Sequence, residues 1–164
     1  MARLDTASAD HLVEGQSATC DILFQLGVMY ATGQGVERDD ACAALWYRTA
    51  AEQGDPSAQN NLGAMYANGQ GLEQSDVLAV FWYARAAEQG HALAQYNLGS
   101  MYHAGRGVRR DPATAYMWML LAAQGGDATA VAGRELAEQR LPAMQIERGR
   151  EMAARWQAAR PPLQ

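Results

Sequence analysis

Lysine is missing from the 164-residue sequence, in which all 13 basic side chains belong to arginine. This absence excludes Schiff-base catalysis, lysine-activated nucleophiles and the phosphate-binding loops that depend on a lysine. Apolar runs of about 18 residues are also missing, so the sequence predicts no membrane span. Basic charge is scarce as well, because the net charge is −5 and the isoelectric point is near 5.1. Nucleic acid is therefore not an expected partner.

Cysteine is scarce, and the sequence contains only Cys20 and Cys42. In two antiparallel helices joined by a turn, these residues are offset by roughly 12 Å along the helix axes, beyond the reach of a disulfide. We therefore expect two unpaired, mostly buried thiols. The histidines, His11, His91 and His103, do not form a metal-ligand set with them, so no metal site and no cofactor are predicted.

The N-terminal segment 1–10 lacks an apolar stretch and carries one arginine and two aspartates, which is not the pattern of a secretory signal. We expect a cytoplasmic protein, or a periplasmic or secreted one if a signal peptide has been removed. The composition is 49% hydrophobic and 19% charged, which provides enough apolar surface for a folded chain. The length allows one domain or a short repeat array.

A unit of 36 residues occurs three times, and it decides the expected fold. Leucine–glycine pairs, methionine–tyrosine pairs and single tryptophans recur at this spacing, at Leu26–Gly27, Leu62–Gly63 and Leu98–Gly99, at Met29–Tyr30, Met65–Tyr66 and Met101–Tyr102, and at Trp46, Trp82 and Trp118. We expect repeats over residues 19–54, 55–90 and 91–126. An extension over residues 1–18, either a short helix or frayed, precedes them, and capping helices over residues 127–164 follow them.

Each unit has the pattern of two antiparallel helices. Asp55, Ser75 and Asp111 stand where they can cap the N-termini of helices. The segment Gly69–Gln70–Gly71 predicts a tight turn between the two helices of a unit, because glycine tolerates positive φ. Gly63 lies inside a helix, where glycine is unfavourable, and its recurrence in each unit predicts close helix–helix packing.

The C-terminal part is expected to form one helix over residues 127–140 and a second over residues 142–159. One face of the second helix carries Ile146, Gly149, Ala153 and Trp156. A solenoid needs a terminal element with one polar face, because its last repeat otherwise exposes its stacking surface. The helix pair is therefore predicted to cap the array.

The repeated pattern carries a family resemblance. The pattern A-x-x-x-L-G-x-M-Y-x-x-G-x-G-V, followed by A-x-x-W-Y-x-x-A-A-E-Q-G, resembles the Sel-one-like repeat (SLR), a relative of the tetratricopeptide repeat. In the first copy it covers Ile22 to Val36 and Ala43 to Gly54. The resemblance implies an all-α fold, a right-handed α-solenoid of three 36-residue helical-hairpin repeats with a C-terminal capping helix pair.

The same resemblance implies that the first helix of each repeat lines a concave face that binds partner segments. The candidate partner-binding residues are Phe24, Gln25, Asn60, Asn61, Asn68, Tyr96, Asn97, Ser100 and His103, with Asp21, Val28, Ser57, Ala64 and Leu93 beside them. Gln25, Asn61 and Asn97 occupy one equivalent position and form an amide ladder that can bond an extended backbone. Phe24 and Tyr96 would be apolar anchors. The alternative is that the amides bond neighbouring backbone within the protein.

No nucleophile, base and orienting group can be combined from the sequence, so no catalytic residues are predicted and the protein is not expected to be an enzyme. We expect a non-catalytic protein–protein interaction module or scaffold, a bacterial adaptor or regulator by the resemblance. The alternative from that resemblance is a small-ligand or cell-wall-fragment binder or hydrolase.

Charge is distributed unevenly along the chain. Residues 1–104 contain 12 acidic residues and 4 arginines, whereas residues 105–164 contain 6 acidic residues and 9 arginines. Ends of opposite sign can orient a polarised partner or a second copy of the chain. End-to-end self-association is therefore a third alternative, beside the reading in which the charges only keep the surface solvated.

Overall fold

The computed structural model describes residues 6–126 and 128–160, with side chains described from residue 19 onward within these ranges. The described chain forms eight helices and no strand, which confirms the expected all-α fold. Their bounds are α1 (Thr6–Thr32), α2 (Asp40–Glu52), α3 (Pro56–Asn68), α4 (Asp76–Glu88), α5 (Ala92–Ala104), α6 (Pro112–Gln124), α7 (Ala128–Arg140) and α8 (Ala143–Ala158). Within the described ranges, none of these helices has both the length and the apolar character that a membrane span requires.

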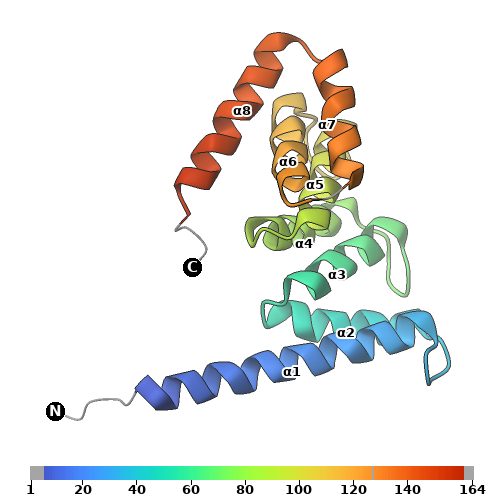
Figure 1. Ribbon diagram of the computed structural model, residues 1–164. Helices are drawn as coiled ribbons and strands as arrows, with labels where there is room; N and C mark the ends of the chain where they lie inside the picture. The colour runs from blue at the N-terminus through green and yellow to red at the C-terminus, as the bar shows by residue number, and fades with distance from the viewer. Residues whose placement is uncertain (1–5, 127, 161–164) are drawn as a thin grey trace.

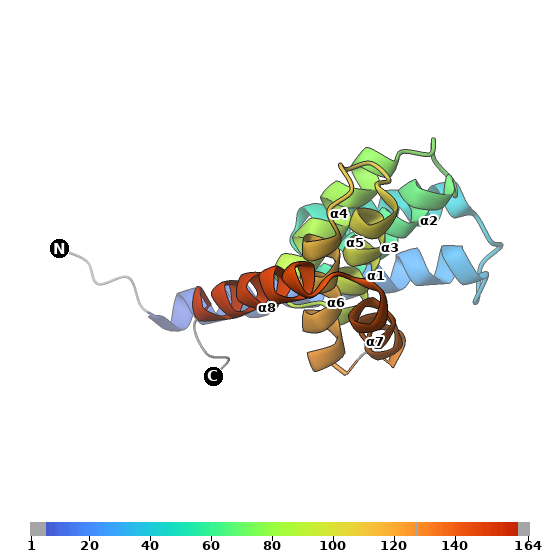
Figure 2. The same cartoon turned by 90° about the horizontal axis from the view of Figure 1, so that it is seen from above.

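The helices form three consecutive hairpins, α1 with α2, α3 with α4, and α5 with α6 (Figure 1). Each hairpin packs on the next, through α2 with α3 and through α4 with α5. The hairpins therefore stack along the chain, and each contacts chiefly its neighbours, as expected of an α-solenoid. Helices α7 and α8 lie at the C-terminal end of this stack, and both contact α6 (Figure 2).

Helix α1 is longer than the other helices of the stack. It has 27 residues, whereas each helix from α2 to α7 has 13. Residues 6–18 of the expected N-terminal extension continue this helix, so its N-terminal half projects beyond α2 (Figure 1). Residues 1–5 of that extension, and residues 127 and 161–164 of the expected cap, lie outside the described residues.

Side chains at the helix N-termini accept hydrogen bonds from backbone N–H groups that have no partner within the helix. Asp55 accepts one at 2.6 Å before α3, and Ser75 accepts one at 3.3 Å before α4. Asp111 accepts two, at 3.1 and 3.3 Å, before α6. These three predicted caps are confirmed. His91 has the same role at α5, where its Nδ1 accepts from the Ala94 N–H at 3.2 Å.

The glycine inside the first helix of each hairpin faces the second helix. A Cβ on Gly63 would lie 2.8 Å from the Tyr83 ring, and one on Gly27 would lie 2.5 Å from the Tyr47 ring. In the third repeat, Met119 stands in place of the tyrosine, and a Cβ on Gly99 would lie 3.0 Å from the nearest backbone oxygen. The predicted close packing at these glycines is confirmed.

The second glycine of the tight turn has a further role in the second and third repeats, which the sequence did not reveal. Gly71 and Gly107 have φ values of 67° and 65°, which is the left-handed region that glycine enters at low cost. A Cβ on Gly71 would overlap the carbonyl group of Asp40, and a Cβ on Gly107 would overlap that of Asp76. Both carbonyls lie at the start of the second helix of the preceding repeat. These glycines therefore allow the repeats to stack closely.

The C-terminal helix α8 packs chiefly along α6 rather than on α7. Gly149 permits the close approach, because a Cβ there would lie 2.7 Å from the Tyr116 ring. Farther along α8, the Trp156 and Trp118 rings form a T-shaped pair, with centroids 5.7 Å apart. Ala153, between these two contacts, is buried. The apolar face predicted for this helix is the one that covers the last repeat.

Candidate functional site

The predicted partner-binding residues lie on α1, α3 and α5, and the structure gives them three levels of exposure. Gln25, Asn68 and His103 are exposed; Phe24, Asn61, Tyr96, Asn97 and Ser100 are half-buried; Asn60 is buried. Asn60 has only 4% of its surface exposed, so it does not present its side chain to a partner.

Asn60 instead links the second and third repeats. Its Oδ1 accepts a hydrogen bond from Asn97 Nδ2 at 3.0 Å, and its Nδ2 donates to Asn61 Oδ1 at 3.4 Å. Asn61 and Asn97, two members of the expected amide ladder, are thus joined through the side-chain amide of Asn60.

Asn61 also lines a small pocket between the first and second repeats, of about 200 Å³. Its lining residues are Ala31, Arg38, Asp40, Tyr47, Asn61, Ala64, Met65 and Gln70. Burial raises the pKa of Tyr47, although a hydrogen bond with Asn61 partly offsets that effect, so the phenol keeps its proton at neutral pH. Arg38 pairs with Asp40 through two hydrogen bonds of 3.1 Å. This pocket offers hydrogen-bonding groups beside apolar surface.

The corresponding place between the second and third repeats holds an arginine. Arg106 stands one repeat after Gln70, and its guanidinium bonds both carboxylate oxygens of Asp76, at 2.6 and 3.2 Å. It also donates to the carbonyl oxygen of Ala67 at 3.2 Å. Burial raises the pKa of the adjacent Tyr83 to about 12, although the charge of Arg106 acts in the opposite direction. An arginine side chain therefore lies at the second junction where the first junction has Gln70.

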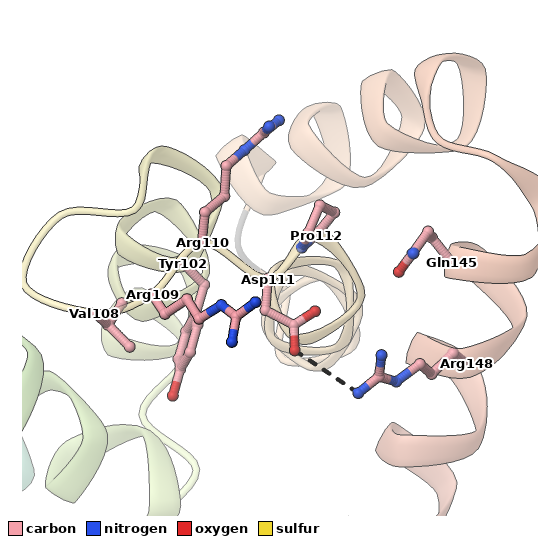
Figure 3. Close-up of a pocket in the computed structure, with 8 residues that line it drawn as sticks. All are labelled: Tyr102, Val108, Arg109, Arg110, Asp111, Pro112, Gln145 and Arg148. Atoms are coloured by element: carbon pink, nitrogen blue, oxygen red, sulfur yellow. Dashed lines mark ion pairs between the residues drawn. The ribbon is translucent and has the colours of Figure 1, made fainter.

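A larger pocket lies where the loop between α5 and α6 meets α8 (Figure 3). Its volume is about 500 Å³, and its lining residues are Tyr102, Val108, Arg109, Arg110, Asp111, Pro112, Gln145 and Arg148. None of them except Tyr102 lies on the first helix of a repeat, so the concave-face expectation missed this pocket. The sequence signal was the basic character of residues 105–164, but the sequence did not show that its arginines meet.

The lining of these two pockets contains no histidine, cysteine or serine. Asp40 is paired with Arg38, and Asp111 is engaged as a helix cap. Burial raises the pKa of Asp111, but hydrogen bonds from Thr114 and Ala113 and the charge of Arg148 outweigh it, so that pKa lies below its usual value. A carboxyl group in this state does not act as a general acid at neutral pH. Both pockets are suited to recognition by hydrogen bonds and charge.

The two cysteines are unpaired, as expected. Both are half-buried rather than mostly buried. Cys20 donates a hydrogen bond from Sγ to Gln53 Oε1 at 3.2 Å, which joins α1 to the residue that follows α2. Burial and the nearby charges of Asp55 and Asp21 raise the pKa of Cys20, and this makes its thiol a weaker nucleophile at neutral pH.

The stacked hairpins and the interlocking glycines define this protein as an α-solenoid of helical repeats. Comparison with known families gives matches to the Sel1 repeat over residues 23–55, 56–91 and 92–127, which together exceed half of the chain. The chain belongs to the Sel1 repeat family. Proteins of this family are generally protein-interaction scaffolds and are typically non-catalytic.

The solved structures that are similar to this chain include the following two. One is c5321, described as a protective antigen of uropathogenic Escherichia coli strains with an SLR fold, at 35% identity and a TM-score of 0.75 over 86% of this chain and 30% of that protein. The other is a Sel1 repeat protein from Oxalobacter formigenes, at 32% identity and a TM-score of 0.70 over 80% of this chain and 60% of that protein. The chain thus spans less than two thirds of either protein. No curated protein matched the sequence.

Proposed function

We propose that the chain is a non-catalytic adaptor that binds an extended segment of a protein partner at the junction of its first and second repeats. One observation carries this proposal: Asn61 and Tyr47 line an open pocket there, whereas Arg106 occupies the corresponding place at the next junction. An amide such as Asn61 can both donate to and accept from a peptide backbone. Because the similar structures from Escherichia coli and Oxalobacter formigenes are bacterial, we propose a bacterial setting.

The remaining candidates extend the proposed surface from this pocket along the first helices. Phe24 and Tyr96 are half-buried aromatic residues that would hold apolar side chains of the partner. The exposed polar residues Gln25, Asn68 and His103 would contact the partner at the edge of the surface. Asn60 and Asn97 support it from behind, because the hydrogen bond between them links α3 to α5.

Selection of peptides from a random display library on the full chain tests this proposal. We expect selected peptides to lose at least fivefold in affinity, measured by calorimetry, when Asn61→Ala removes the amide. Glu52→Gln is the control, because Glu52 is an exposed residue of α2 outside the pocket lining. Equal affinities for Asn61→Ala and the parent chain would show that the peptides do not bind at this junction, which is called the groove below.

A further inference from the structure

The arginine pocket between the third repeat and α8 is a second site, separate from the groove proposed above. We propose that it binds an acidic segment of a protein partner. Side-chain carboxylates of the partner would lie between Arg109 and Arg148, and a backbone N–H of the partner would donate to the side-chain oxygen of Gln145. The proposal does not depend on the groove at the first junction, since the two pockets share no lining residue.

The position of α8 creates this site. Gly149 lets α8 approach α6 closely, and the ring contact between Trp156 and Trp118 fixes the helix farther along. This packing places the first two turns of α8, with Gln145 and Arg148, opposite the loop that carries Arg109. Figure 3 shows the guanidinium groups of Arg109 and Arg148 approaching the space beside Asp111 from opposite sides.

The charge of the pocket favours an anionic ligand. Three arginines line it, and Asp111 is the one carboxylate among its lining residues. That carboxylate already accepts two backbone N–H groups and the Thr114 hydroxyl, the last at 2.9 Å. Its contact with Arg148 is long, at 4.0 Å, and 60% of the Arg148 side chain is exposed. The guanidinium of Arg148 therefore retains donors that a ligand carboxylate can use.

Gln145 requires a hydrogen-bond donor. Its Oε1 is buried and has no hydrogen-bond partner among the described residues, and its amide points into the pocket (Figure 3). A buried acceptor without a partner is costly, so a ligand that supplies an N–H gains free energy there. A peptide brings this N–H together with carboxylates, whereas inorganic phosphate would bring two negative charges next to Asp111 and mainly acceptors to Gln145.

The second repeat shows that the fold does not need these positive charges. Its loop lines a pocket of about 440 Å³ with Glu73 in place of Arg109 and Gln74 in place of Arg110. Gln74 donates to the carbonyl oxygen of Ala67 at 3.1 Å, just as Arg110 donates to that of His103 at 3.0 Å. A neutral amide therefore performs the structural task of Arg110. The positive charges of Arg109 and Arg110 are therefore not needed to form the turn, and a role in binding accounts for them.

Titration of the isotope-labelled full chain with short blocked peptides tests the proposal. The probes are acetyl-Gly-Glu-Glu-Glu-Gly-amide, the same peptide with glutamine in place of glutamate, and inorganic phosphate. We expect the glutamate peptide to shift the backbone resonances of residues 107–111 and 143–148 and to bind at least tenfold more tightly than the glutamine peptide. Phosphate that binds as tightly as the glutamate peptide would overturn the assignment to an acidic peptide segment.

Charge-reversal variants locate the binding. Arg109→Glu combined with Arg148→Glu should weaken the glutamate peptide at least tenfold. The matched control is Arg85→Glu with Arg155→Glu, which makes the same change in net charge at exposed arginines outside the pocket. An equal loss in the control pair would show that only net charge is sensed, and would overturn the site. Circular dichroism of each variant verifies that it is folded.

The variant Asn61→Ala separates this proposal from the groove proposal. We expect it to leave binding of the glutamate peptide within twofold of the parent chain. If the glutamate peptide instead shifts resonances of Asn61 and Tyr47 and not those of the arginine pocket, the acidic segment binds in the groove and the arginine-pocket assignment is wrong. Loss of groove binding with an intact response at residues 107–111 would overturn the groove alone.

Discussion

The second and third repeats have the same backbone conformation at their turns but differ in the charge of their loops. Both turn through a glycine that lies against the preceding repeat, Gly71 in one and Gly107 in the other. At the residue two positions later, however, the second repeat has Glu73 and the third has Arg109. The comparison teaches that stacking constrains the small residues, while exposed loop positions are left to vary with what each repeat contacts. Four predictions address pairs of equivalent positions in these repeats, beginning with the largest expected effect.

The turn glycines test the shared backbone. Gly71→Ala and Gly107→Ala should each lower the free energy of unfolding by about 3 kcal/mol, because positive φ and a clash with a backbone carbonyl act together. Gly35→Ala is the control, since the nearest atom to its Cβ would be a methionine methyl group 3.6 Å away and not a backbone carbonyl. That variant should lose about 1 kcal/mol, for φ alone. Urea unfolding measures all three, and equal losses would contradict the stacking role of the glycines.

The first helices of the two repeats have different caps, Asp55 and His91. Burial lowers the pKa of His91, although the charge of Asp55 partly offsets this effect. The cap requires neutral Nδ1, so its stabilisation is complete above the unfolded-state pKa of about 6.5 and is lost as the pH falls through the lower folded-state pKa. We expect the loss to reach about 1 kcal/mol, the usual value of an N-cap.

Thermal unfolding of the parent chain and of His91→Asn between pH 7 and pH 5 checks this prediction. Asparagine caps a helix without titrating in this range, so the variant should lose less stability on acidification than the parent chain. The carboxylates are common to both proteins and cancel in the difference. Parallel profiles of the parent and the variant would rule out the proposed titration of the cap.

Gln70 and Arg106 distinguish the two junctions. Arg106→Gln should lower the free energy of unfolding by about 0.5 kcal/mol, because the ion pair with Asp76 is partly exposed, at 46% and 31% of the two side chains. A double-mutant cycle with Asp76→Asn measures the coupling. The reverse change, Gln70→Arg, should fill the first pocket and weaken the peptides selected on the groove. Unchanged peptide affinity in that variant would count against the open junction as the binding site.

Glu73 and Arg109 should have the smallest effect on stability. Both are exposed, and neither makes a hydrogen bond on which its turn depends in the described part of the chain. Exchanging them, as Glu73→Arg and Arg109→Glu, should therefore change the free energy of unfolding by less than about 0.5 kcal/mol. Chemical denaturation measures each variant. A larger loss in either one would show that the loop charges belong to the folding of their own repeats.

The residues that act locally were predictable. Asp55, Ser75 and Asp111 cap helices as the sequence indicates, since a cap depends on backbone N–H groups only two or three residues away. Gly63 was also predictable as a packing residue. Glycine is unfavourable inside a helix, so its recurrence at this position in every repeat indicates a structural role common to the repeats. The arginine pocket was not predictable, because it requires Arg148 on α8 to meet a loop nearly 40 residues earlier in the chain.

Asn60 shows the same limit within the repeats. Its register suggested a groove-facing side chain, but the structure buries it between Asn61 and Asn97. Periodicity identifies the face of a helix to within about one residue position, since neighbouring side chains are about 100° apart. The relative rotation of stacked hairpins then decides which side of that face is covered. No pattern in a single repeat contains this rotation.

The sequence by itself determined the repeat unit, its turns and caps, and the absence of lysine that leaves arginine as the basic residue. These properties depend on neighbours in the chain, so they are expressed wherever the unit occurs. The tertiary structure alone decided that α8 packs along α6, that three arginines line one pocket, and that Arg106 bonds Asp76 at the second junction while Asn61 and Tyr47 line a pocket at the first. The physical reason is that each of these depends on the packing of side chains from separate helices.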